Sequence, residues 1–120
     1  MLKFSDNNNC PVTILSGDVH SASIYQIENQ NKFPRARVFN ATSSAISRKP
    51  APSKAELLIK KTGKIDGYKG GYATRLYALS GEYNFIVATV DETGDPSVEI
   101  DLYWPGGDDG ELTQKKLRLV

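Results

Sequence analysis

The sequence predicts an α+β domain that is mostly antiparallel β, with one short helix near 53–62. Two observations predict it. Apolar stretches rich in β-branched and aromatic residues alternate with turn residues over most of the chain. A helix-capping pattern, in contrast, stands out at one place only. The length of 120 residues is that of one domain, so 1–120 is expected to be a single domain or part of one.

Three strands are predicted in the first third of the chain. The stretch "CPVTILSGD" has the strand formers Val12, Ile14 and Leu15, and Ser16, Gly17 and Asp18 end it. "SASIYQIE" alternates in polarity and predicts a second strand to about Glu28. "RARVFNATSS" predicts a third strand, and the proline-rich "SRKPAPSK" after it cannot lie inside a sheet.

The predicted helix begins at Ser53, because Ser53 and Glu56 have the spacing of a capping box. Leu57 and Leu58 give it an apolar side, and Gly63 is a plausible stop. The glycine-rich stretch "GKIDGYKGGY" is expected to be a loop. From Tyr72 onward we expect a meander of four antiparallel strands joined by hairpins, with the sequences "YATRLYALS", "YNFIVATVD", "SVEIDLYWP" and "LTQKKLRLV".

Composition argues against several classes of protein. Fifteen basic and fourteen acidic residues give a net charge of +1, so there is no electrostatic basis for a nucleic-acid partner. No apolar run approaches the roughly 20 residues of a membrane helix, and no signal peptide is recognisable. The single cysteine excludes an internal disulfide and a cysteine-rich zinc site. A soluble chain without membrane insertion is expected.

The strongest candidate for chemistry is the pair Asp18 and His20, which follows the first predicted strand. A carboxylate and the only imidazole of the chain, two positions apart, could face the same side and converge on a cation. Gly17 would permit the tight backbone there. Metal sites normally have three or four ligands, however. From the residues alone the stretch is either a corner of a metal site or a turn that holds a structural histidine.

A resemblance to a known family favours the metal site. "VTILSGDVHSA" resembles the last metal-binding block of the PhoD-like alkaline phosphatases, a branch of the calcineurin-like metallophosphoesterases. The strand ending in paired serines ("RVFNATSS") and the later strand with an Asn-Phe pair ("YNFIVATV") are similar in order and character. The first residues, "MLKFS", resemble the end of the helix that precedes this block in the family.

This resemblance implies the C-terminal half of a metallophosphoesterase-type α/β/β/α sandwich. His20 would bind one metal ion through a ring nitrogen, and Asp18 would bind or orient at the other, with Ser16 and Gly17 supporting the turn. The cofactors would be divalent or trivalent metal ions (Fe, Ca, Mn or Zn). The two ions would clamp a phosphate mono- or diester and stabilise charge on its attacking and leaving oxygens.

The family's earlier ligand blocks, Asp-x-His, Gly-Asp and Gly-Asn-His, are absent from this sequence. The chain is therefore expected to be the C-terminal portion of a larger hydrolase, to need the missing N-terminal part of the same domain as its partner, and to be inactive alone. The alternative is a stand-alone β-rich binding module in which His20 is structural and exposed tyrosines and Trp104 contact a partner. An independent small metalloenzyme is disfavoured, because no other residues of the chain complete the site.

Overall fold

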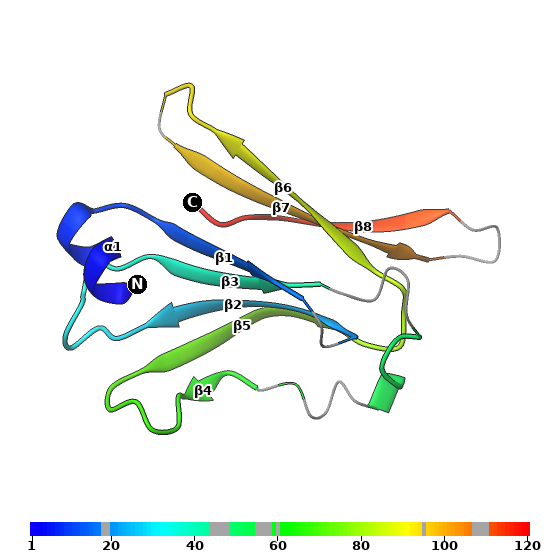
Figure 1. Cartoon of the computed structure of the whole chain (residues 1–120), viewed down its shortest axis with the longest axis horizontal. Helices are drawn as coiled ribbons and strands as arrows, with labels where there is room; N and C mark the ends of the chain where they lie inside the picture. Colours follow the sequence, from blue (N-terminus) through cyan, green and yellow to red (C-terminus); the bar gives the residue numbers. More distant parts are fainter. Residues whose placement is uncertain (18–19, 44–48, 55–58, 60, 95, 107–110) are drawn as a thin grey trace.

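The secondary structure is defined by a computed structural model of the chain, which describes residues 1–17, 20–43, 49–54, 59, 61–94, 96–106 and 111–120. One α-helix, α1 (Leu2–Asn8), comes first among these residues. Eight strands follow it (Figure 1): β1 (Val12–Ser16), β2 (Ala22–Glu28), β3 (Val38–Thr42), β4 (Gly63–Lys64), β5 (Tyr72–Leu79), β6 (Phe85–Asp91), β7 (Ser97–Pro105) and β8 (Leu112–Arg118).

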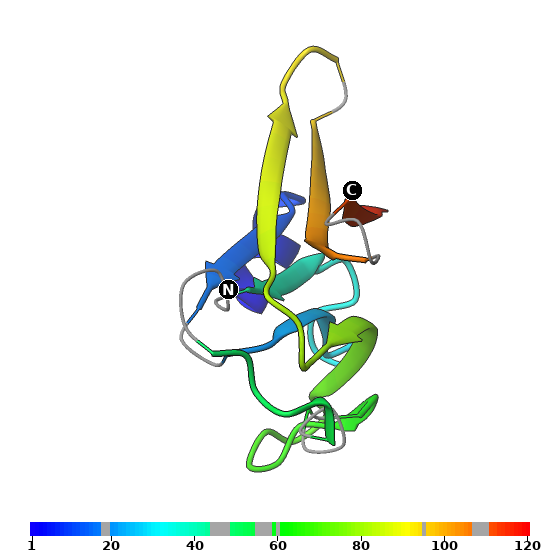
Figure 2. The same cartoon turned by 90° about the vertical axis from the view of Figure 1, so that its right-hand side faces the viewer.

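The strands form two sheets. The first has the order β1-β3-β2-β5-β4, and the second has the order β6-β7-β8. Among the strands of the described residues, β1 and β3 are the one parallel pair, and the other pairs are antiparallel. The predicted α+β class, mostly antiparallel with one short helix, is confirmed for the described residues, but that helix is α1 and not the one expected near 53–62. Figure 2 shows that the β6–β7 hairpin extends beyond the first sheet.

The core lies between the two sheets. Ile24 and Ala41 of the first sheet and Ile100 of the second are fully buried and belong to one apolar cluster. Tyr77 of β5 stacks on Trp104 of β7, with ring centroids 6.0 Å apart. Each buried large aliphatic side chain contributes about 1.5–3 kcal/mol. Packing across the two sheets therefore holds them together.

A buried serine helps to attach helix α1 to the segment just before β3. Ser5 is fully buried, and its hydroxyl accepts a hydrogen bond from Arg37 N (2.8 Å) and donates to Arg37 O (3.3 Å). The helix ends at Asn9, which has a left-handed φ of 48° as asparagine often does there. The family resemblance predicts the end of a helix at this place. Within the described residues, no helix is long and apolar enough to cross a membrane.

The predicted four-stranded meander is wrong in one respect. All four strands exist, but β5 pairs with β2 and β4 in the first sheet, and only β6, β7 and β8 form a meander. The cause lies in the link between β5 and β6, which crosses from one sheet to the other. Gly81 there adopts a φ of +87°, a conformation that other residues rarely take.

The C-terminal part of the predicted helix near 53–62 is not helical where the structure describes it. Ser53 and Lys54 have 3₁₀-helical conformation, whereas residues 55–58 and 60 lie outside the described residues, Glu56 of the capping box among them. Ile59, Lys61 and Thr62 are not helical. The physical reason is competition from β5: Thr62 Oγ1 accepts a hydrogen bond from Arg75 N (2.9 Å), and the next two residues pair with β5 as β4.

Candidate functional site

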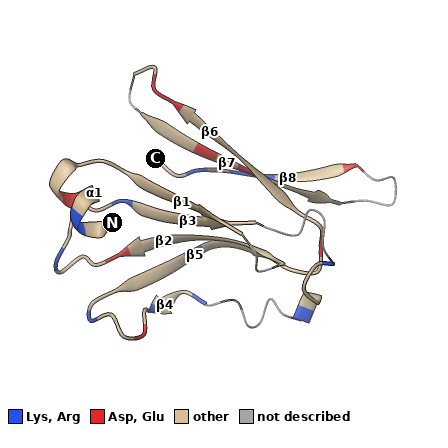
Figure 3. Ribbon diagram, in the orientation of Figure 1, with Lys and Arg blue, Asp and Glu red and all other residues tan. Residues whose placement is uncertain are grey.

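The candidate site lies at the carboxyl ends of β1 and β3. Because these strands are parallel and in register from Val12 to Ser16, Ser16 lies beside Thr42, and Ser43 N donates to Ser16 O (3.1 Å). Side chains that follow such strand ends meet at one edge of a sheet. Neither strand contains a charged residue (Figure 3), so the polar groups within this end of the two strands are uncharged.

Three side chains at this edge form a closed ring of hydrogen bonds. Thr42 Oγ1 donates to Asn40 Oδ1 (3.1 Å), and Asn40 Nδ2 donates to Ser16 Oγ (3.3 Å). The Ser16 hydroxyl lies 2.6 Å from Thr42 Oγ1. Because the Thr42 proton is directed to Asn40, the Ser16 hydroxyl is the donor in this third bond. The Ser16 hydroxyl proton is thus used in a hydrogen bond that fixes the end of β1 to β3. This arrangement is that of a residue supporting the turn and not of a nucleophile.

Ser43 connects the ring to the crossover between the sheets. Its hydroxyl donates to Asn84 Oδ1 (2.7 Å), and Asn84 Nδ2 donates to Glu82 O (3.0 Å). Asn84 is only 2% exposed, so both polar atoms of its amide are satisfied inside the protein. The fold thereby joins one residue of the paired serines to the asparagine of the Asn-Phe pair, 41 positions later.

His20 lies at the same end of the first sheet. It comes shortly before β2, and the start of β2 lies beside the end of β3 because these strands are antiparallel. Its backbone has a left-handed φ of 54°, a conformation that costs a non-glycine residue free energy and needs support from its surroundings. Ala51 N, which donates to His20 O (2.8 Å), provides part of that support.

A hydrogen bond to a backbone carbonyl orients the imidazole of His20. Its Nδ1 lies 2.9 Å from Lys49 O, and a carbonyl oxygen can only accept, so Nδ1 carries the proton. In the neutral ring, this leaves Nε2 as the acceptor atom. A hydrogen bond from one ring nitrogen to a backbone carbonyl is how metal-ligating histidines are commonly oriented.

The same contacts fasten the segment 49–53 to the first sheet. Besides the two bonds to His20, Ser80 Oγ donates to Pro52 O (3.1 Å). At Gly81 a Cβ atom would lie 3.0 Å from Ser53 Cα, so glycine permits the close approach there. His20 therefore has a structural role in positioning this segment, whatever else it binds.

Of the predicted site residues, Ser16, Gly17 and His20 are at this edge, and Asp18 lies outside the described residues. Among the residues that are described, no three His, Cys, Asp or Glu side chains are grouped closely enough to hold a metal ion. Tyr25, which lies opposite Asn40, has a pKa raised by burial, an effect partly offset by the Arg75 guanidinium. Its phenol is therefore neutral at physiological pH.

Asn40, Thr42, Ser43 and Asn84 were not predicted as site residues. A polar residue inside the apolar run "VFNAT" is the one sequence signal that could have pointed to Asn40. No family model, no curated protein and no solved structure matches this chain.

Proposed function

We propose that this chain supplies the Asp18–His20 ligand block of a metal-dependent phosphoesterase similar to the PhoD-like phosphatases. The observation that carries the proposal is the orientation of His20, whose Nδ1 donates to Lys49 O. Its position beside the carboxyl ends of two parallel strands, where ligands collect in such sheets, supports it further.

Each residue of the block has a role in this proposal. Ser16 holds the end of β1 through the ring with Asn40 and Thr42. Gly17 forms the turn, Asp18 provides a carboxylate oxygen, and His20 provides Nε2. A dinuclear metal centre, when bound, supplies Lewis acidity toward a phosphate ester. Asp18 and His20 are fewer ligands than such a centre needs, so the preceding part of the same domain would supply the others.

Metal titration of the purified chain tests this proposal. By calorimetry with Zn²⁺ and with Mn²⁺, we expect one weak site per chain and no hydrolysis of phosphate mono- or diesters. Asp18→Asn and His20→Gln should each weaken binding at least tenfold, because second-shell changes alone cost metal sites 10–100-fold. Glu111→Gln is the matched control, since it removes one exposed carboxylate elsewhere. Equal affinity in all four proteins would refute the proposal.

A second candidate, a β-rich binding module, is favoured by one observation. The two hydrogen bonds between His20 and the segment 49–53 give the histidine a structural role that needs no metal. Tyr72 and Tyr83 are exposed enough (41% and 49%) to contact a partner, whereas Trp104 is half-buried and stacks on Tyr77. Under this alternative, metal ions leave the His20 ring unchanged, and the titration above separates the two.

A further inference from the structure

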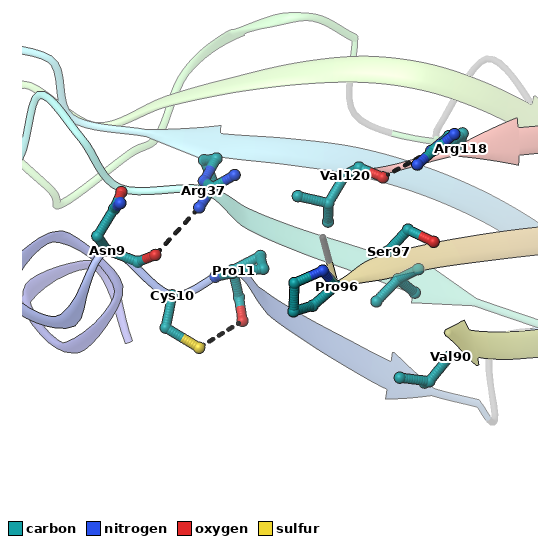
Figure 4. Close-up of a pocket in the computed structure, with 10 residues that line it drawn as sticks. Asn9, Cys10, Pro11, Arg37, Val90, Pro96, Ser97, Arg118 and Val120 are labelled. Atoms are coloured by element: carbon teal, nitrogen blue, oxygen red, sulfur yellow. Dashed lines mark hydrogen bonds between the residues drawn. The ribbon is translucent and has the colours of Figure 1, made fainter. Parts of the chain in front are cut away.

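A groove opens between the two sheets at the end of the molecule opposite the candidate site. It has a volume of about 730 Å³, and its walls come from the start of β1, the start of β3, the β6–β7 hairpin and the end of β8. Figure 4 shows side chains that line it, Arg37, Val90, Pro96, Arg118 and Val120 among them. This volume is within the range of pockets that bind small organic molecules.

The walls of the groove are mostly apolar. Val90 is on the side of β6 that faces the first sheet, since the alternate residue Ile86 packs against the core. It is nevertheless 62% exposed, so nothing in the described part of the chain covers it. In the view of Figure 4, Pro96 and Val120 lie between Arg37 and Val90. An aliphatic chain placed along these side chains would remove apolar surface from water.

The charged side chains of the groove are both cationic. Arg37 and Arg118 line it, and no lining side chain among the described residues is acidic. Arg118 Nε donates to Val120 O (3.0 Å), and its charge also acts on Asp91. Arg37 is half-buried and donates one bond, from Nη2 to Asn9 O (3.1 Å). None of the ion pairs within the described residues involves it.

We propose that this groove binds a small amphipathic carboxylate. The carboxylate would be held by the Arg37 guanidinium, whose planar donors match its two oxygens, and the aliphatic chain would lie against Val90 and Pro96. The site is independent of the metal ligands, because the groove is at the start of β1 and the ligand block follows its end. Failure of one proposal therefore leaves the other standing.

Calorimetric titration with decanoate tests the proposal, with decylammonium as the probe of opposite charge. We expect saturable one-to-one binding of decanoate, at least about tenfold weaker binding of hexanoate, which has four CH₂ groups fewer, and no saturable binding of decylammonium. Decylammonium binding as tightly as decanoate would overturn the proposal, because the groove would then recognise the alkyl chain of the probe and not the charge of its head group. Absence of decanoate binding at about 1 mM would also overturn it.

Two matched pairs of variants locate the site. Arg37→Gln should weaken decanoate binding about tenfold, since it removes a charge-assisted hydrogen bond, while Arg35→Gln removes the same charge outside the groove and should leave binding unchanged. Val90→Asn should weaken binding severalfold, and Val87→Asn, on the other face of the same strand, should not. Val90 and Val87 are both exposed, so these two variants keep the test valid if Arg37→Gln fails to fold.

Equal effects within either pair would overturn the proposal. So would dimerisation, measured by sedimentation, that Val90→Asn abolishes and decanoate leaves unchanged, because the groove would then bind a second copy of the chain.

Discussion

Thr13 of β1 has a buried hydroxyl without a hydrogen-bond partner among the described residues, and replacing it should stabilise the protein. Thr13 lies beside Phe39, which is 5% exposed, so its Oγ1 is turned into apolar surroundings. Burying an unpaired hydroxyl costs about 1–3 kcal/mol. Valine has nearly the same shape and no hydroxyl. We therefore expect Thr13→Val to raise the free energy of unfolding by about 1 kcal/mol, or the midpoint of thermal unfolding by about 4 °C.

Thr42→Val is the matched control, because the same exchange there has the opposite sign. The Thr42 hydroxyl makes two hydrogen bonds in the ring with Ser16 and Asn40. Its loss should lower the free energy of unfolding by about 1–2 kcal/mol, since two neighbouring groups lose a partner. Urea unfolding of both variants measures the two values. A destabilised Thr13→Val protein would refute the reasoning, because the hydroxyl would then have a partner.

Two further predictions concern the helix and the β6–β7 turn. Ser5→Ala should lower the free energy of unfolding by about 1–2 kcal/mol, because Arg37 N loses its partner and Arg37 O keeps only the bond from Val12 N. The exposed Asn8→Ala should change it little, and equal values in urea unfolding would contradict this. The pKa of Asp91 should lie below its ordinary value of 3.8, chiefly because the Thr93 side chain and backbone donate to its carboxylate, and Thr93→Val should raise it in an NMR titration. A lowered pKa stabilises the fold above the unfolded value, and this stabilisation is lost as pH falls through the folded pKa. An unchanged pKa in Thr93→Val would contradict the assignment.

The strands could be predicted from local sequence, but their partners could not. Each predicted strand is present because runs such as "VTIL" and "FIVATV" are rich in β-branched residues. Which strands share a sheet depends on contacts between distant residues. β5 pairs with β2 across about fifty positions, which no turn signal encodes, so a hairpin with the adjacent β6 was the wrong expectation.

The candidate site was predictable in the same partial way. The only histidine, next to a strand end, is a visible signal, and so is Gly17, which the sequence predicts in a turn. The partner of its Nδ1 is a backbone carbonyl 29 positions away, and any carbonyl looks alike in a sequence. The burial of Asn84 between Tyr83 and Phe85 could not be predicted from the sequence either, because it is caused by the crossing of the chain from one sheet to the other.

Because His20 is the only histidine, ring ¹⁵N NMR of the intact chain reports on this one residue and tests the metal-ligand proposal directly. The spectrum should show the proton on Nδ1 and the lone pair on Nε2, as the bond to Lys49 O requires. On addition of Zn²⁺ the Nε2 resonance should shift, and Asp18→Asn should abolish the shift at the same metal concentration while Glu111→Gln leaves it unchanged. A proton on Nε2, or a Zn²⁺ shift of equal size in Asp18→Asn, would contradict the assignment of Asp18 and His20 as one ligand block.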